Sequence, residues 1–101
     1  MRYLFYRKVY IMPKIYEPKV YVDIDASPPH PDNTKYRVSI GIENWNGKQV
    51  SVTKVQMVYD GKIAGRRSPS YPIGTDDYQR VNLAIEKLIL LRNDSLDVVI
   101  A

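Results

Sequence analysis

The stretch Tyr36-Arg37-Val38-Ser39-Ile40-Gly41-Ile42 decides the fold class, because its even-numbered residues are apolar and its odd-numbered residues are small or polar. Successive side chains in a strand point to opposite faces, so a period of two predicts a strand with one face on a core. Asn46-Gly47 follows, and this dipeptide favours the positive φ angles of a tight hairpin turn. The strand is therefore expected to pair antiparallel with the residues after the turn.

The strand after the turn changes the phase of its apolar residues. The two sets are Val50 and Val52, and then Val55, Met57 and Tyr59. One extra residue between the sets would keep both on the core side of the sheet. The sequence therefore predicts a β-bulge near Thr53-Lys54.

Two more strands are predicted before this hairpin. Lys19–Asp25 alternates cleanly, with apolar residues at its even positions, and residues 2–12 are rich in aromatic and β-branched types. Pro13 and Pro18 lie between the two segments and indicate a bend or an irregular edge, because proline donates no ladder hydrogen bond. The proline-rich residues 27–33 are expected to form a surface loop.

The chain after the hairpin predicts a short strand and a loop. Asp60-Gly61 favours a further turn, and Lys62–Arg67 follows as a short strand that leads into the loop Ser68–Pro72. Near the end of the sequence, Leu96–Ile100 indicates a last short strand.

One helix is predicted between the loop and this last strand. Thr75 is a credible N-cap, Asp76 and Asp77 suit the first turn, and Arg92-Asn93 suits the end. The core-facing stripe comprises Tyr78, Val81, Ile85, Leu88 and the aliphatic stem of Arg92. Three leucines fall outside this stripe, namely Leu83, Leu90 and Leu91. Because an exposed apolar patch usually marks an interface, we expect a homodimer through the helix.

Composition is consistent with one globular domain over residues 1–101. Hydrophobic residues make up 45% and charged residues 26%, which excludes the low-hydrophobicity signature of disorder. The chain has no cysteine, so disulfides, thiolate metal sites and cysteine nucleophiles are excluded. The predicted fold class is α+β, a mainly antiparallel sheet of four to five strands followed by one C-terminal helix.

Charge and apolar runs bound the partners and the location. The net charge of +4 suits nucleic acid or an anionic surface. The first residues carry charges inside their apolar run and do not have the pattern of a signal peptide, and no apolar run is long enough to cross a membrane. We therefore expect an intracellular protein, cytoplasmic or nucleoid-associated, that has no membrane partner and needs no cofactor.

Catalytic and metal-binding motifs are weak. Asp23 and Asp25 share one strand face and, together with Glu43, could hold Mg²⁺ for nuclease chemistry. The alternative is a solvated face on which these carboxylates pair with Arg37 or Lys19, and we predict no metal site. His30 is the only histidine and lies in the proline-rich loop, where solvent exposure is expected. We expect no enzyme, with nuclease-type activity through the two aspartates left as an open alternative.

One constellation of residues points to nucleic acid. Between residues 45 and 71 the chain mixes aromatic and cationic residues, and only Asp60 is acidic. The aromatic residues are Trp45, Tyr59 and Tyr71, and the cations are Lys48, Lys54, Lys62, Arg66 and Arg67. Aromatic faces stack on bases of any sequence while cations track phosphates, which is how proteins bind single strands. The alternative is that Trp45 and Tyr59 pack in the core and the cations only solvate the sheet.

The spacing of several short motifs resembles a known family over residues 36–92. These motifs are Gly47-Lys48, Gly61-Lys62, Gly65-Arg66, Pro72-Ile73 and a helix carrying Gln79 and Ile85. The pattern is similar to that of the positive-cofactor-four family of transcriptional coactivators. Two features depart from that family: Arg67–Tyr71 lacks a compact lysine-glycine run, and Tyr78 stands where tryptophan or a similar large residue is usual. The first 35 residues have no counterpart in the family core.

The resemblance implies a curved four-stranded antiparallel sheet, one helix that helps to form a homodimer, and single-stranded DNA bound on the sheets. It implies phosphate contacts from Lys48, Lys54, Lys62 and Arg66, with stacking from Trp45 or Tyr59. The leading hypothesis is therefore a non-catalytic, homodimeric binder of single-stranded nucleic acid with low sequence specificity. The alternative is a protein-interaction or assembly module, for example a viral or accessory protein, without enzymatic activity.

Overall fold

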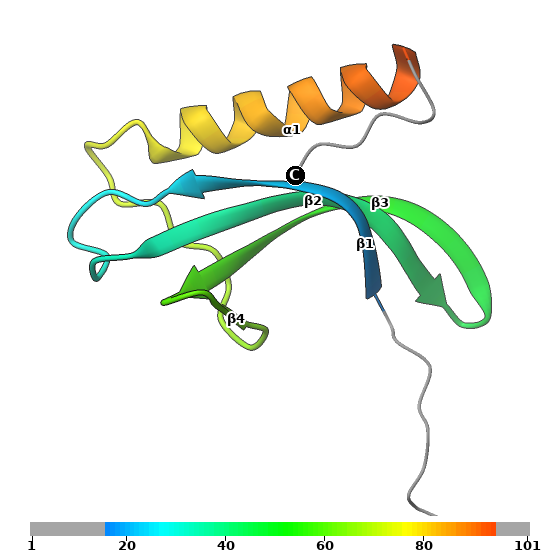
Figure 1. The fold of residues 1–101 in the computed structure, drawn as a ribbon, viewed down its shortest axis with the longest axis horizontal. Coiled ribbons are helices and arrows are strands. Elements are labelled where there is room, and N and C mark those ends of the chain that lie inside the picture. The colour runs from blue at the N-terminus through cyan, green and yellow to red at the C-terminus, as the bar shows by residue number, and fades with distance from the viewer. Residues whose placement is uncertain (1–15, 95–101) are drawn as a thin grey trace, which may run out of the picture.

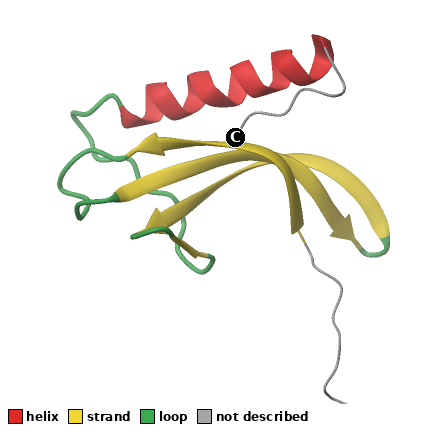
Figure 2. Cartoon of the chain, in the orientation of Figure 1, coloured by secondary structure: helices red, strands yellow, loops and turns green. Residues whose placement is uncertain are grey.

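The protein has an α+β fold in which a four-stranded antiparallel sheet is followed by one C-terminal helix (Figure 1). A computed structural model describes residues 16–94. The strands lie in the sheet in chain order, β1-β2-β3-β4, and α1 follows them (Figure 2). Their bounds are β1 Tyr16–Asp25, β2 Thr34–Trp45, β3 Lys48–Tyr59, β4 Lys62–Ala64 and α1 Asp77–Asp94. The strands predicted at residues 2–12 and 96–100 lie outside the described residues.

Two tight turns join the last three strands, as the sequence predicted. Asn46 and Gly47 have φ angles of 53° and 86°, and Asp60 and Gly61 have 49° and 80°. Positive φ at both central residues matches the twist of paired strands, and asparagine, aspartate and glycine reach it at low cost. The sheet is therefore a meander of neighbouring hairpins.

The predicted β-bulge near Thr53-Lys54 is wrong. The β2–β3 register runs without interruption from Thr34 opposite Tyr59 to Trp45 opposite Lys48. The phase change in the sequence has another cause, because the two sets of apolar residues in β3 lie on opposite faces of the sheet. The irregularity is in β1 instead, where the register shifts between Pro18 and Val20.

The sheet arches, with α1 over its convex side and the concave face on the other side (Figure 1). The core between α1 and the sheet contains Tyr36, Val38, Ile40, Met57, Val81, Ala84 and Leu88, all buried. The even-numbered residues of β1, Val20, Val22 and Ile24, pack against this core as predicted. The odd-numbered residues of β2, and those of β1 from Tyr21 onward, therefore face the concave side, whereas before the register shift Tyr16 lies on that side.

A glycine in β2 allows β1 to cross closely at its irregular end. A Cβ atom built on Gly41 would lie 2.8 Å from both Pro18 Cα and the Tyr16 hydroxyl oxygen. Real Cβ atoms do not approach other heavy atoms so closely, so a side chain here would push β1 away. Gly41 thus holds Tyr16 on the concave face.

The middle of the predicted helical stripe is confirmed, whereas its two ends are exposed. Val81 and Leu88 are buried and Ile85 packs against the core, but Tyr78 is 58% exposed and Arg92 is also exposed. Tyr78 lies in the first turn and contacts the Tyr71 ring edge-on, with centroids 5.5 Å apart, instead of entering the core. The leucines outside the stripe are exposed, as expected, at 51% for Leu83, 60% for Leu90 and 39% for Leu91.

The start of α1 is tied to the sheet through a buried carboxylate. Asp77 is fully buried and accepts hydrogen bonds from the Ser27 backbone N–H at 2.9 Å, the Ser27 hydroxyl at 2.5 Å and the Tyr36 hydroxyl at 2.7 Å. Arg80 Nη2 lies 2.7 Å from it. Thr75 Oγ1 accepts the Asp77 N–H at 3.4 Å, and the Asp76 carbonyl accepts the first helical hydrogen bond, from the Arg80 N–H at 3.0 Å, so the cap lies at Thr75-Asp76. Among the described residues, no helix combines the length and apolar character that a membrane span requires.

Candidate nucleic-acid interface

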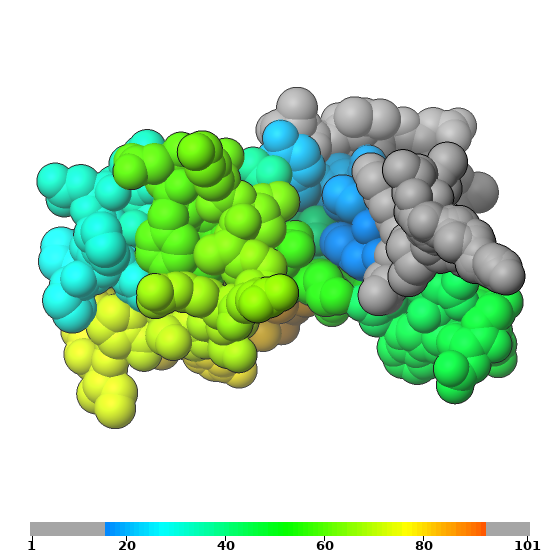
Figure 3. Space-filling view, turned by 90° about the horizontal axis from the view of Figure 1, so that it is seen from below, coloured from blue at the N-terminus to red at the C-terminus, as the bar shows by residue number. Residues whose placement is uncertain are grey.

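The structure divides the residues of the predicted constellation among three places. Trp45 and Lys48 lie at the tip of the β2–β3 hairpin, and Lys54 lies in the middle of the concave face. Tyr59, Lys62, Arg66 and Arg67 lie at and after the opposite end of β3. Figure 3 looks onto this face, with the green hairpin tip on one side and the yellow-green segment around β4 on the other.

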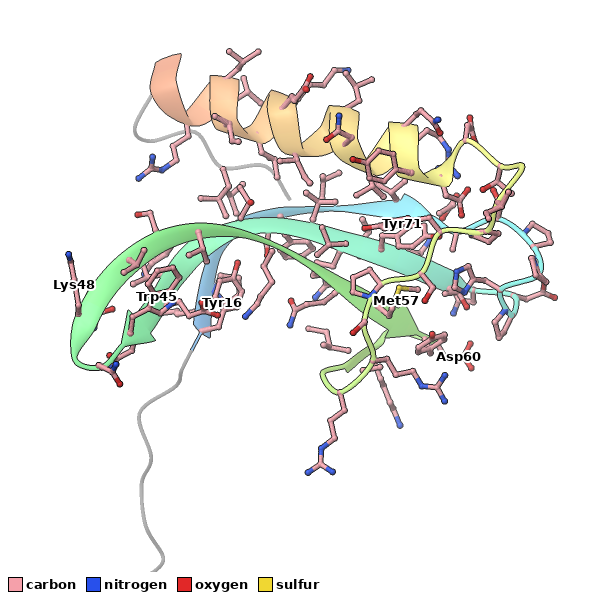
Figure 4. All side chains as sticks on the ribbon, turned by 180° about the vertical axis from the view of Figure 1, so that it is seen from behind. Tyr16, Trp45, Lys48, Met57, Asp60 and Tyr71 are labelled. Carbon is pink, nitrogen blue, oxygen red and sulfur yellow. The ribbon has the colours of Figure 1, made fainter. Side chains whose placement is uncertain are left out.

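The hairpin tip presents an exposed aromatic ring next to a cation. Trp45 is 53% exposed and stands opposite Lys48 in the β2–β3 register. Its Nε1–H donates to Glu43 Oε1 at 2.7 Å, which orients the ring under the arch of the sheet (Figure 4). Lys48 is also exposed. Trp45 is therefore outside the core, and its ring is available for stacking.

In the middle of the concave face, Lys54 is engaged within the protein. Its Nζ forms an ion pair with Glu43 and lies 4.7 Å from the centre of the Tyr16 ring. The Tyr16 hydroxyl in turn contacts Ser39 Oγ at 2.6 Å. Hydrogen bonds from Lys54 and Trp45 lower the pKa of Glu43, so the carboxylate stays charged and neutralises Lys54. Lys54 therefore offers little free charge to a phosphate.

The acidic residues of β1 are also paired. Arg37 donates two hydrogen bonds to Asp23, from Nε at 2.8 Å and Nη2 at 2.9 Å, and its guanidinium lies 4.0 Å from the centre of the Tyr21 ring. Lys35 binds Asp25 at 2.5 Å, and this hydrogen bond lowers the pKa of Asp25.

Each aspartate that the sequence offered as a Mg²⁺ ligand is thus paired with a cation. Asp23 pairs with Arg37, as the solvated-face alternative expected, whereas Asp25 pairs with Lys35. In the part of the chain that the structure describes, no three His, Asp or Glu side chains come close enough to hold a metal ion.

The β4 end carries three exposed cations. Lys62, Arg66 and Arg67 are exposed, and within residues 16–94 none of them forms an ion pair with a carboxylate. The Arg67 guanidinium lies 5.6 Å from the centre of the Tyr59 ring, a cation–π contact that holds the loop after β4 near the end of β3. Asp60 accepts a hydrogen bond from Asn33 Nδ2 at 3.1 Å and does not offset these cations directly.

Tyr59 and Tyr71 serve packing as well. Tyr59 is partly buried against the core. Tyr71 lies between α1 and the sheet (Figure 4), and its ring stacks on Tyr36 with centroids 5.1 Å apart. Burial raises the pKa of Tyr71. Tyr71, which the sequence grouped with the cations, therefore belongs to the helix-side core.

The loop histidine also has a structural environment. His30 is half-buried, its Nε2 lies 2.8 Å from the Ser70 carbonyl oxygen, and its ring meets Tyr36 edge-on at 5.7 Å. The expectation of a solvent-exposed side chain is only partly met. His30 links the loop before β2 to the loop before α1.

Three concave-face residues were not assigned to the site from sequence. Arg37 and Tyr21 form a stacked pair, and Tyr16 lies against Lys54. The alternation of β1 already placed Tyr21 on this face, so the signal for that residue existed. The position of Tyr16 depends on the register shift after Pro18, which alternation does not reveal.

Neither a family model, nor a curated protein sequence, nor a solved structure matches this chain significantly.

Proposed function

We propose that this protein binds single-stranded nucleic acid on the concave face of its sheet, without catalysis, as a homodimer and with little sequence preference. The observation that carries the proposal is the exposed Trp45 ring beside Lys48 at the tip of the β2–β3 hairpin, combined with three exposed cations in and after β4 at the opposite end of β3. An aromatic face accepts any base, and unpaired cations attract phosphates.

The two ends are far enough apart to engage several nucleotides. Lys48 and Tyr59 are the first and last residues of β3, and a strand of this length spans at most about 36 Å. Known single-strand sites on comparable small β domains cover about 4–16 nucleotides. In the proposal, a strand stacks one base on Trp45 and follows the arch towards Lys62, Arg66 and Arg67.

In the middle of the concave face, the cationic side chains are already neutralised, so this region adds little net charge for binding nucleic acid. Lys54 and Arg37 are matched by Glu43 and Asp23, and both lie against tyrosine rings. Electrostatic attraction should therefore come mainly from the two ends. We expect Lys54 to contribute less to nucleic-acid affinity than the sequence suggested.

The test is a fluorescence-anisotropy titration with labelled single-stranded oligonucleotides at two salt concentrations. Affinity should fall steeply with salt, because neutralised phosphates release counterions in proportion to the contacts made. A duplex of the same sequence is the control, and it should bind more weakly because its bases are not open to stacking. Absent binding at low salt, or an affinity independent of salt, would count against the proposal.

A protein-interaction module is the second candidate, and the exposed leucines of α1 favour it. Leu83 and Leu90 are more than half exposed, which is unusual for large apolar side chains on one helix flank. This function needs no cationic surface. If the protein binds no oligonucleotide at low salt, the interaction module becomes the better account.

A further inference from the structure

A groove runs between α1 and the outer edge of β1. Its volume is about 510 Å³, and its apolar lining includes Val22, Ile24, Leu83, Leu88 and Leu91. Within the described residues, β1 pairs only with β2, so its other edge presents unpaired backbone N–H and C=O groups. Natural proteins rarely leave a long edge strand beside exposed leucines without a partner.

We propose that a second copy of this chain occupies the groove, with its β1 pairing antiparallel to β1 in a register centred on Tyr21. The proposal specifies how the homodimer of the proposed function forms, and it does not depend on nucleic-acid binding. Such an interface is symmetric, because the same surface is used by both subunits.

The sequence of β1 is self-complementary in this register. Val20 faces Val22 of the partner subunit on the helix side, so two apolar pairs form across the two-fold axis. Lys19, the extra residue at the register shift of β1, lies opposite the partner's Asp23 in this register, which gives two pairs of opposite charge, and opposed charges of this kind stabilise cross-strand pairing. Lys19 is free to make this contact, because its pair with Glu17 spans 3.5 Å and both side chains are more than half exposed.

The spacing of the layers fits the helices as well. α1 packs over β1 and β2, and neighbouring strands lie about 4.8 Å apart. Because α1 lies closer to β2 than to β1, two helices placed symmetrically above the joined sheets would be separated by about two to three strand spacings, roughly 10–14 Å, and large side chains on their facing flanks would fill the space between them. Leu83 and Leu91, which line the groove of their own subunit, would face the partner's groove.

Joining two β1 edges turns two four-stranded sheets into one sheet of eight strands. The concave faces become continuous, and the Tyr21 and Arg37 pairs of the two subunits meet near the two-fold axis. A nucleic-acid strand could then pass from one subunit to the other.

The first experiment uses the absence of cysteine from the chain. Tyr21→Cys places a single thiol at the proposed two-fold axis, where it faces its own counterpart in the partner. Mild oxidation should convert most of the protein to a covalent dimer, whereas Ile73→Cys, whose position is fully exposed outside the interface, should remain largely monomeric on denaturing gels. A dimer that does not crosslink through residue 21 would overturn the register.

The second experiment measures mass by sedimentation of the unmodified chain and two variants, without nucleic acid. The unmodified chain should sediment at twice 11.7 kDa at micromolar concentration. Lys19→Glu sets like charges opposite Asp23, and Leu83→Lys places a charge in the apolar lining of the groove, so each should raise the dimer dissociation constant about tenfold or more. Ile73→Lys is the matched control and should not change it.

A monomer at these concentrations would overturn the proposal, since the edge would then be left to residues 95–101 or to another protein. A monomer would not bear on nucleic-acid binding, which the oligonucleotide titration tests separately.

Discussion

The Tyr36 hydroxyl of β2 donates a 2.7 Å hydrogen bond to Asp77 of α1, and both residues are fully buried. Burial by itself would raise the pKa of Asp77, but hydrogen bonds from Ser27 and Tyr36 and the charge of Arg80 outweigh it, and the pKa lies below its usual range. Burial and the Asp77 carboxylate raise the pKa of Tyr36. Asp77 is therefore a charged acceptor and Tyr36 a neutral donor, and their hydrogen bond fixes the start of α1 on the sheet.

Asp77→Asn should destabilise the protein by about 3 kcal/mol, because it leaves Arg80 without its buried partner and mismatches two donors. Urea unfolding followed by circular dichroism measures the change. Asp76→Asn is the matched control one residue earlier, where the carboxylate is 71% exposed and its loss should cost less than about 0.5 kcal/mol. Equal stabilities of the two variants would show that Asp77 does not hold the helix.

Acid should weaken the fold through the same carboxylate. A carboxyl group with a depressed pKa contributes stability above its unfolded pKa of about 3.9, and that contribution is lost as the pH falls through the lower folded value. The melting temperature of the unmodified protein should therefore drop below about pH 4 more steeply than that of Asp77→Asn. Parallel pH profiles of the two proteins would contradict this assignment.

Gly41→Ala should destabilise the sheet by about 1–3 kcal/mol, because the new methyl group would collide with the β1 backbone and with Tyr16. Thermal melts provide the measurement. Gly65→Ala is the control, since a Cβ there meets no atom within 4 Å. If both variants melt at the same temperature, β1 can move away at no cost and the close crossing is not a constraint.

Trp45→Ala should weaken binding of a single-stranded oligonucleotide by about 1–3 kcal/mol, the cost of losing one stacking platform. Because Trp45 is 53% exposed, the melting temperature of the Trp45→Ala protein should be close to that of the unmodified protein, unlike that of a variant with a truncated core residue. Binding should also quench the fluorescence of Trp45, the only tryptophan. Unchanged affinity and fluorescence would place the site elsewhere.

Cationic side chains that form an ion pair within the protein should contribute less to the salt dependence of oligonucleotide affinity than unpaired ones. Lys48→Ala and Arg66→Ala should each reduce the slope of affinity against salt by about 1, since both side chains are exposed and unpaired within residues 16–94. Lys54→Ala should reduce it less, because Glu43 already neutralises that lysine. Titrations at several salt concentrations distinguish these outcomes, and a larger effect at Lys54 would mean that the ion pair opens on binding.

Local chemistry explains why much of the fold could be predicted. Asn46-Gly47 and Asp60-Gly61 specify turns through their own backbone preferences, and the alternation in β1 and β2 reports which side chains are buried. Thr75 and the spacing of Val81, Ile85 and Leu88 likewise mark the helix without reference to the rest of the chain. These features depend on neighbours a few residues apart, so the sequence alone determined the antiparallel hairpins, the single helix and its extra leucines.

The tertiary structure alone decided which groups meet across distant segments. The phase change in β3 indicated a bulge, yet the two sets of apolar residues lie on opposite faces of a sheet that keeps its register, while the irregularity belongs to β1. Lys54 and Tyr71 were counted with the free cations and aromatic platforms, but Glu43 from β2 neutralises the first and Tyr36 covers the second. Asp77 looked like a helix-end charge and is the buried link to Ser27 and Tyr36. Charge state and exposure depend on partners brought together from 11 to 50 residues away, and a one-dimensional pattern carries no record of those approaches.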